Sequence, residues 1–468
     1  MKTIFNTLIV LISGTLSSFG QTPQWAWASG GGGSSLDYGT SISVDANRNL
    51  YLTGWFNSST ISFGINTLTN NGPEGTSDIF IAKYDSNGQL LWVKNFGGSG
   101  DDRSVSIKTN SQGVFVLTGW YNSLTLTLGN NTLKNAGGSD IFIARFNQEG
   151  AVLWAKSIGG SAGDEGTSIS CDSRDNIYVT GTYESATINF GNSALTSVGN
   201  HDIFLVGYDQ SGQLLWAKNI GGKNDDNGST VTNDGDGNIY LSGKFRSATV
   251  SLGEKTLSNA GKDGNYGDIF MTKYNPSGKL TWVKSLGGSY YDEVYSITTD
   301  MNSNVYLTGW FKSDTIVFGC DTLMECTILT RAHGVEYGDV FIAKYDTYGE
   351  PVWAKRAGGM AKDFGFGITT NAVGDVYLTG IFESNYTASG QMKSTNVRGN
   401  DIFISKYNPE GKVLWAKSIY GSAMARCITT DVNGDVYFAG VYHALEMRFD
   451  NTLLKNAGDG DIFVAKLK

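Results

Sequence analysis

The sequence is poor in the residues that cross-link or interrupt a chain. Its 468 residues include 4 Cys, 5 Pro and 3 His, and charged residues make up 17%. So few cysteines exclude a disulfide-rich scaffold, and the low charge content beside 40% hydrophobic residues excludes a charge-rich disordered chain. The scarcity of proline and the lack of a Gly-X-Y period exclude a collagen-like chain, although 62 residues are glycine.

An excess of basic residues is also missing. The formal net charge is −9 and the pI is near 5.0, so we expect no nucleic-acid partner. Catalytic motifs are missing too: His201, His333 and His443 have no metal-ligand spacing, and no G-x-S-x-G, H-E-x-x-H or Walker pattern occurs. These absences favour a non-enzymatic protein without a cofactor, and they leave catalysis by scattered carboxylates open.

Long apolar runs are absent after the N-terminus. The chain opens with Met1 and Lys2, continues with a mostly apolar stretch over residues 4–16, and then has small residues up to Gly20. This pattern is typical of a secretory signal peptide and is too short for a membrane span. We predict a signal peptide over residues 1–20, a mature protein of residues 21–468 without a transmembrane segment, and export to the periplasm, the cell surface or the medium.

The four cysteines fall into two groups. Cys320 and Cys326 lie six residues apart in one irregular segment, so a disulfide between them is possible in an oxidising compartment. Cys171 and Cys427 lie in strand-like segments, where we predict buried free thiols, because unpaired cysteines are often buried.

What the sequence does contain is repetition. An Asp-Ile-Phe or Asp-Val-Phe triplet recurs seven times, at intervals of 60 to 71 residues, and a Trp followed five or six residues later by Gly keeps nearly the same spacing. The chain is therefore seven copies of one unit. The triplets start at Asp78, Asp140, Asp202, Asp268, Asp339, Asp401 and Asp461, and the tryptophans are Trp25, Trp92, Trp154, Trp216, Trp282, Trp353 and Trp415.

Each unit has the pattern of four short strands. In the first unit these are residues 41–44, 50–56, 78–84 and 89–96, with a small hairpin-like piece over residues 61–68. Alternating residues, β-branched and aromatic side chains and turn residues at each gap favour strands, and no segment carries a sustained helical period. Seven all-β units with four strands predict a seven-bladed β-propeller, with an open β-solenoid as the alternative.

The two ends of the repeat array discriminate between these architectures. The first unit begins with a fourth strand over residues 24–29, and the last unit ends on a third strand over residues 461–467. A closed ring needs this complement, whereas a solenoid does not. We therefore predict that the N-terminal strand completes the last blade and so pairs two edges that would otherwise be prone to aggregation. We also expect a monomer.

The motif order also resembles a known family. The segment DIFIAKYDSNGQLLWVKNFGGSGDD at residues 78–102, followed by SIKTN and GVFVLTG, resembles the SBBP type of bacterial β-propeller repeat. The resemblance extends over residues 24–468. It implies a β-propeller fold and an exported protein, and it implies little about the ligand.

Two sets of residues that depart from the repeat are candidate ligand-binding residues. The position before the last aromatic of the second strand varies between units and is tryptophan in three of them, Trp55, Trp120 and Trp310. These side chains would stack on sugar rings or peptide aromatics, or else pack locally. The fifth unit is the longest, and its extra segment contains Arg331, His333 and Tyr337. Insertions in repeat folds often form the binding face.

Six units carry an aspartate five residues before the Ile or Val of the first strand. We expect it in the glycine-rich loop between blades, where the six carboxylates would ring one end of the channel. The ring would bind calcium or attract a basic ligand; alternatively, each carboxylate accepts hydrogen bonds from its own turn. The residues are Asp37, Asp102, Asp164, Asp226, Asp292 and Asp363.

Together these features predict an exported, non-enzymatic propeller that binds an extracellular polysaccharide or protein through the connections between second and third strands. Two alternatives remain. One is a propeller hydrolase or lyase that acts on polysaccharide with channel carboxylates. The other is a structural component of the cell envelope.

Overall fold

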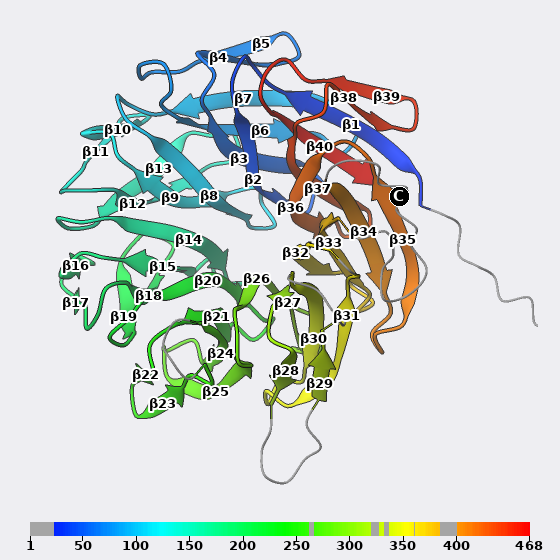
Figure 1. Cartoon of the computed structure of the whole chain (residues 1–468). Coiled ribbons are helices and arrows are strands. Elements are labelled where there is room, and N and C mark those ends of the chain that lie inside the picture. The colour runs from blue at the N-terminus through cyan, green and yellow to red at the C-terminus, as the bar shows by residue number, and fades with distance from the viewer. Residues whose placement is uncertain (1–22, 262–265, 320–326, 332–336, 360, 384–399) are drawn as a thin grey trace, which may run out of the picture.

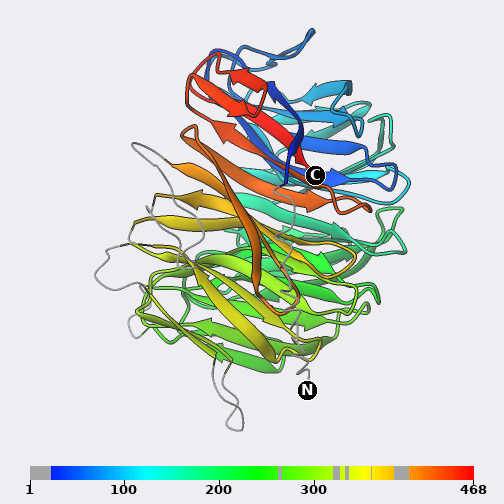
Figure 2. The same ribbon diagram turned by 90° about the vertical axis from the view of Figure 1, so that its right-hand side faces the viewer.

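The chain was analysed as a computed structural model, which describes residues 23–261, 266–319, 327–331, 337–359, 361–383 and 400–468. These residues form forty strands and no helix, and hence no helix that would span a membrane. Seven antiparallel blades surround a central channel (Figure 1), and the molecule is a thick disc in side view (Figure 2). The predicted seven-bladed propeller is confirmed. The predicted signal peptide and the pair Cys320 and Cys326 lie outside the described residues.

Each blade has four strands, which run from the channel to the circumference. The blades, innermost strand first, are β2 (Asp37–Val44), β3 (Leu50–Phe56), β6 (Asp78–Tyr84), β7 (Leu90–Phe96); β8 (Asp102–Thr109), β9 (Phe115–Tyr121), β12 (Asp140–Phe146), β13 (Val152–Ile158); β14 (Asp164–Cys171), β15 (Ile177–Tyr183), β18 (Asp202–Tyr208), β19 (Leu214–Ile220); β20 (Asp226–Asn233), β21 (Ile239–Phe245), β24 (Asp268–Tyr274), β25 (Leu280–Gly287); β26 (Asp292–Thr299), β27 (Val305–Phe311), β30 (Asp339–Tyr345), β31 (Pro351–Ala357); β32 (Asp363–Thr370), β33 (Val376–Phe382), β34 (Asp401–Tyr407), β35 (Val413–Ile419); and β36 (Ala423–Thr430), β37 (Val436–Tyr442), β40 (Asp461–Leu467), β1 (Trp25–Gly31).

Among the described residues, a short hairpin follows the second strand of six blades; most of the corresponding connection of the remaining blade, residues 384–399, lies outside them. Isolated bridges such as Gly97 to Thr127 and Gly221 to Ser251 join a hairpin to the end of the preceding blade's fourth strand. The hairpins therefore fasten neighbouring blades at the circumference. They are β4 (Thr60–Phe63) with β5 (Asn66–Thr69), β10 (Thr125–Leu128) with β11 (Asn131–Lys134), β16 (Thr187–Asn189) with β17 (Ala194–Thr196), β22 (Thr249–Leu252) with β23 (Lys255–Ser258), β28 (Thr315–Phe318) with β29 (Thr327–Thr330), and β38 (Glu446–Phe449) with β39 (Thr452–Lys455).

The N-terminal strand closes the ring, as the sequence predicts. Strand β1 pairs antiparallel with β40, and Figure 1 shows the blue strand beside the red one. Trp27 lies opposite Lys466, the position that Trp92 takes opposite Lys83 in the first blade. The sequence marker Trp25 is therefore wrong by two residues. Trp27 is the repeat tryptophan, because its pairing with Lys466 matches the pairing of Trp92 with Lys83. A register shift separates Trp25 from Trp27.

The core lies between the blades. The aromatic that ends each second strand is at most 2% exposed and packs in the apolar layer between neighbouring sheets. Burying seven such rings supplies the cohesion that helices supply in other folds. The residues are Phe56, Tyr121, Tyr183, Phe245, Phe311, Phe382 and Tyr442.

The two cysteines among the described residues, Cys171 and Cys427, are free thiols and are half-buried. Burial raises the thiol pKa of Cys171 to about 11 and that of Cys427 to about 12.

Candidate functional site

On one face of the disc, the same backbone hydrogen bond recurs in every blade, whereas the side chains differ from blade to blade. The crossovers between blades and the connections after the second strands meet there, around one end of the channel. In each blade the N–H of the residue after the second strand donates to the carbonyl just before the first strand, over 2.7–3.1 Å. We call this face the mouth and these residues the mouth pairs: Asn57 to Leu36, Asn122 to Asp101, Glu184 to Gly163, Arg246 to Asp225, Lys312 to Tyr291, Glu383 to Lys362 and His443 to Ser422.

The six ring aspartates lie directly beneath the mouth. Each is the first residue of its blade's innermost strand and is at most 1% exposed, so the expectation that they lie in the loop is wrong. The strand begins earlier than its alternating pattern shows, because the first residues already pair with the second strand. In five blades the carboxylate accepts a hydrogen bond from the hydroxyl of a serine that lies two residues after the second strand. The serine and carboxylate oxygens are 2.6–2.8 Å apart. The acceptor and donor pairs are Asp37 with Ser58, Asp102 with Ser123, Asp164 with Ser185, Asp226 with Ser247 and Asp292 with Ser313.

The two glycines in six of the seven crossovers make room for this arrangement. A Cβ on Gly97 would lie 1.9 Å from the Asp78 carboxylate, and one on Gly98 would lie 2.6 Å from the Ser123 hydroxyl. Neither position accepts a side chain, which explains the paired glycines. The Gly98 N–H in turn donates to Asp102 over 2.7 Å.

The seventh blade lacks several parts of this unit. Its innermost strand begins with Ala423 in place of the aspartate, Ala444 stands in place of the serine, and Tyr420 replaces the first crossover glycine. The seventh blade therefore lacks both the aspartate and the serine. This joint absence indicates that the main role of each side chain is its hydrogen bond with the other. The serine is the partner that the sequence reasoning missed. Its presence in six units and absence from the seventh is the signal that would have identified it.

Loss of water raises the pKa of the buried carboxyls around the crossovers. Desolvation by burial raises the pKa of Asp37 and Asp292 to about 7, and that of Asp102 and Asp226 to about 6. Hydrogen bonds from the serines and from backbone N–H groups act in the opposite direction and are outweighed. These groups therefore take up protons on folding at mildly acidic pH.

Stability should accordingly fall as the pH rises. The folded-state pKa values exceed the value near 4 of an unfolded aspartate, so the stabilisation is fully present below about pH 4 and is lost as the pH rises through about 6 to 7. We expect a higher melting temperature at about pH 5 than at about pH 8, measured by circular dichroism. Asp226→Asn, which cannot titrate, should make this slope shallower. A melting temperature that rises with pH over this range would contradict the expectation.

A metal role of the ring aspartates stays a prediction. Among the described residues, no group of three or more His, Cys, Asp or Glu side chains is arranged to hold a metal ion. Each described ring carboxylate instead faces its own crossover; Asp363, for example, accepts the N–H groups of Gly359 and Glu383. A calcium titration checks the prediction, since binding heat and a thermal shift would support a cation site and the lack of both would reject it.

The three candidate tryptophans lie near the ends of the second strands of their blades, just below the mouth. Each pairs across the two innermost strands with the residue that follows the ring aspartate, as Tyr38 with Trp55 and Arg103 with Trp120. The Tyr38 ring stacks on Trp55 at 5.3 Å, and the Arg103 guanidinium lies 4.2 Å from the Trp55 centroid and 5.2 Å from that of Trp120. These indoles therefore contact side chains of the chain itself.

Trp310 is held in the same way. Its Nε1–H donates to Glu293 over 3.0 Å, its ring lies 5.3 Å from that of Phe364, and a Cβ on Gly338 would lie 2.3 Å from it. The role of the three tryptophans as a stacking platform stays a prediction. We expect the triple change of Trp55, Trp120 and Trp310 to Ala to weaken ligand binding about tenfold or more, measured by calorimetry on variants that keep the wild-type circular dichroism spectrum. Unchanged binding would reject the platform.

A cavity of about 580 Å³ occupies the channel below the mouth; innermost strands of all seven blades line it, and blades 3 to 5 supply most of its residues. Glu165 lines it, and desolvation raises the pKa of this carboxyl even though its side chain is exposed to the cavity. Glu293 is half-buried, and its ion pair with Lys244 and its hydrogen bonds from Trp310 and Tyr295 outweigh desolvation and lower its pKa. The cavity thus holds two carboxyls with opposite pKa shifts.

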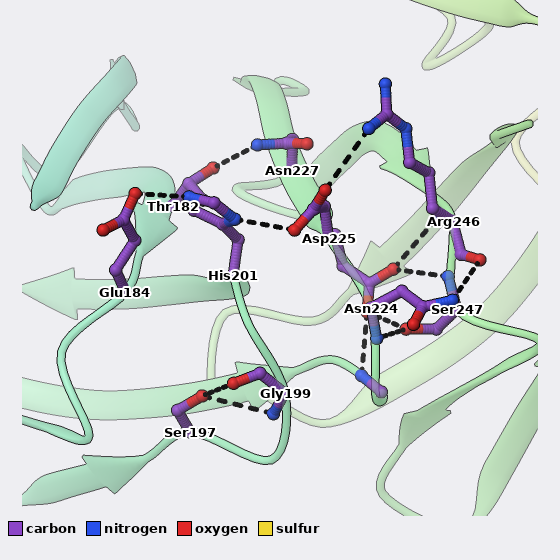
Figure 3. Close-up of polar contacts among 12 residues, drawn as sticks. Thr182, Glu184, Ser197, Gly199, His201, Asn224, Asp225, Asn227, Arg246 and Ser247 are labelled. Atoms are coloured by element: carbon purple, nitrogen blue, oxygen red, sulfur yellow. Dashed lines mark hydrogen bonds and ion pairs between the residues drawn. The ribbon is translucent and has the colours of Figure 1, made fainter. Parts of the chain in front are cut away.

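A polar network (Figure 3) includes Glu184 and His201, which line this cavity. The His201 ring lies between the carboxylates of Glu184, at 2.5 Å from Nε2, and Asp225, at 2.8 Å from Nδ1, and Asp225 also accepts from Arg246 over 3.3 Å. Burial opposes the charged imidazole, but the two carboxylates outweigh it and raise the pKa of His201. The network joins the mouth pairs of blades 3 and 4.

Two described residues of the fifth unit's extra segment, Arg331 and Tyr337, make contacts near this face. Arg331 pairs with Asp314 over 2.7 Å and donates to the Tyr337 carbonyl over 3.4 Å. Tyr337 is 40% exposed, and Lys362 of the next crossover lies 5.2 Å from its ring centroid. His333 lies outside the described residues.

Comparison with known proteins agrees with this architecture. Residues 281–310 match the family model of the SBBP β-propeller repeat, which confirms the resemblance of the motifs. The match runs from β25 through β26 into β27, so the sequence repeat starts on a fourth strand whereas the blade starts on a first strand.

Two curated proteins are similar over part of the chain. An uncharacterised WD repeat-containing protein of Acanthamoeba polyphaga mimivirus is 25% identical over 333 residues, which cover 58% of this chain and 23% of that protein. The regulatory protein FlaEY of Caulobacter vibrioides is 27% identical over 116 residues, which cover 25% of this chain and 12% of that protein. The chain therefore spans less than a quarter of the length of either relative.

Several solved structures are also similar. They include Sqt1 from Chaetomium thermophilum, with a TM-score of 0.44 at 9% identity over 90% of this chain and 97% of that one. The Neurospora crassa Pan2 WD40 domain has a TM-score of 0.40 at 9% identity over 91% and 88% of the two chains. Streptogramin B lyase has a TM-score of 0.40 at 11% identity over 92% and 93%. None of these similarities extends to a ligand or a reaction of this chain.

Proposed function

We propose that the protein is exported and acts as a non-catalytic binding module that takes an extracellular polysaccharide or protein at the mouth. The mouth pairs carry this proposal. Their backbone hydrogen bond recurs in all seven blades, while the two side chains differ from blade to blade. The backbone of the mouth pairs keeps the same hydrogen bond with different side chains. Residues at these positions can therefore vary for ligand recognition without destabilising the fold.

The same face combines hollow shape with mixed charge. The cavity lies beside Glu184, His201 and Lys244, and Arg246 and Lys312 stand on the rim of the mouth. Binding sites are concave and have a few placed polar groups, which is the character of this region. The opposite face consists of tight turns, such as that from Asp85 to Gln89, whose side chains bind their own backbone.

The proposal is tested with glycan and protein arrays probed with the labelled mature chain. We expect a ligand whose binding is weakened by Glu184→Gln combined with Arg246→Gln. Glu149→Gln, which changes an exposed carboxylate on the opposite face, is the matched control. Binding that is lost in the control and kept in the mouth variant would overturn the proposal.

A propeller hydrolase or lyase is the second candidate. Glu165 and Glu293 line one cavity and have pKa values shifted in opposite directions, as a proton donor and a charged carboxylate need. Incubation with each bound glycan separates the two functions. Product release that is lost in Glu165→Gln would establish catalysis, and intact glycan after long incubation would reject it.

A further inference from the structure

The rim of the mouth beside blades 4 to 6 carries aromatic side chains that the fold does not need. Tyr290 and Tyr291 occupy the crossover that leads into β26. Five other blades make the same crossover with a different pair of residues, none of them aromatic. These pairs are Ser35 and Leu36, Gly100 and Asp101, Ala162 and Gly163, Asn224 and Asp225, and Ala361 and Lys362.

The tyrosines form one cluster with a third ring and two cations. Tyr266 stacks on Tyr290 at 4.2 Å and meets Tyr291 edge-on at 4.9 Å. The Lys312 ammonium lies 4.9 Å from the Tyr290 centroid, and the Arg246 guanidinium lies 5.6 Å from that of Tyr291. The three rings are half-buried, so the cluster is rigid and still reaches the surface.

Positive charge continues along this rim to the next blade. Lys362 lies over Tyr337 at 5.2 Å, as Lys312 lies over Tyr290. Within the part of the chain that the structure describes, neither ammonium has a carboxylate within salt-bridge distance. Arg246, by contrast, pairs with Asp225. Among the described residues, other lysines, such as Lys94 and Lys156, also lie over aromatic rings without a salt bridge, but they are on fourth strands, whereas Lys312 and Lys362 are both members of mouth pairs.

We propose that this rim, formed by Tyr266, Tyr290, Tyr291, Lys312 and Lys362, is the docking site of an acidic polypeptide segment of a protein partner. The inference rests on the proposed function and names the partner class. Tyrosine and arginine dominate the energetic centres of protein interfaces, and unpaired lysines complement carboxylates. A sugar would need a free ring face, whereas the faces of Tyr290 carry Tyr266 and Lys312.

Binding of labelled poly-L-glutamate to the mature chain, measured by fluorescence anisotropy at low and raised salt, tests the inference. We expect binding that weakens about tenfold in Tyr290→Ala. Lys312→Gln combined with Lys362→Gln should weaken it about three- to tenfold and reduce its salt dependence. Tyr348→Ala and Lys218→Gln are matched controls, since Tyr348 is 75% exposed on the opposite face and Lys218 lies on the outer strand β19.

Three results of this assay would overturn the inference. These are no binding of poly-L-glutamate, equal loss in the controls, or binding of polygalacturonate in preference to poly-L-glutamate, which would assign the rim to an acidic polysaccharide. A ligand from the arrays that needs Glu184 and Arg246 but tolerates Tyr290→Ala would also overturn it, while leaving the proposed function intact.

Discussion

Removing residues 24–31 should open the ring and lower the free energy of unfolding by about 5–10 kcal/mol. Strand β1 pairs with β40 from Trp25 to Gly31, and Gln24 and Lys468 exchange two further backbone hydrogen bonds of 3.0 Å. Trp25 also packs against Phe449, with ring centroids 5.1 Å apart. The deletion exposes the edge of β40 and leaves the aromatic layer of the last blade without its cover.

Urea unfolding followed by circular dichroism measures this loss. A synthetic peptide of residues 23–31, added in trans, should restore part of the stability because it pairs with the free edge of β40. A scrambled peptide of the same composition is the control. An unfolding midpoint equal to that of the wild type would reject the closed ring, and so would a deletion variant that the native peptide leaves unchanged.

The second large effect is expected at the aspartate and serine pair. Asp102→Ala leaves the hydroxyl and N–H of Ser123 and the N–H of Gly98 without their acceptor, within a site that is fully buried. Each buried donor without a partner costs about 1–3 kcal/mol, so we expect a loss of about 3–5 kcal/mol. Glu149→Ala, on the exposed face opposite, should change the stability by less than about 0.5 kcal/mol.

The pair of alanines in the seventh blade sharpens this prediction. The double variant of Asp102→Ala with Ser123→Ala copies the arrangement of Ala423 and Ala444. We expect the double variant to lose at least about 1 kcal/mol less than the sum of the single variants, since removing both partners leaves fewer unpaired groups. Urea unfolding of the four proteins measures this coupling. Strictly additive losses would show that the two side chains act independently.

Much of the fold is local in sequence and was therefore predictable. The ranges 50–56 and 78–84 match β3 and β6 to the residue, because their alternation and flanking turns are contained in a few neighbouring residues. The first strand was predicted too short, since its start at Asp37 pairs with Phe56 and looks like loop in isolation. The choice of Trp25 over Trp27 failed for a similar reason, because the register is set by a strand at the other end of the chain.

The candidate site was harder to predict because its members are distant in sequence. Leu36 and Asn57 form a mouth pair through a backbone bond that has no sequence signature. The tryptophans were identified by their departure from the repeat, but Arg103 between Trp55 and Trp120 became visible only through the packing of neighbouring blades. Variation between units thus marked the face that we propose as the binding face, while the contacts that organise this face required the structure.

The central claim is that the mouth, and not the opposite face, recognises a ligand. The most direct measurement compares the affinity of the strongest array ligand for the wild type, for a mouth variant and for an opposite-face variant of equal melting temperature. The mouth variant combines Glu184→Ala with Lys312→Ala, and the opposite-face variant combines Glu149→Ala with Tyr348→Ala. We predict a loss of about tenfold or more in the mouth variant alone. Equal affinities, or a loss confined to the opposite-face variant, would contradict the claim.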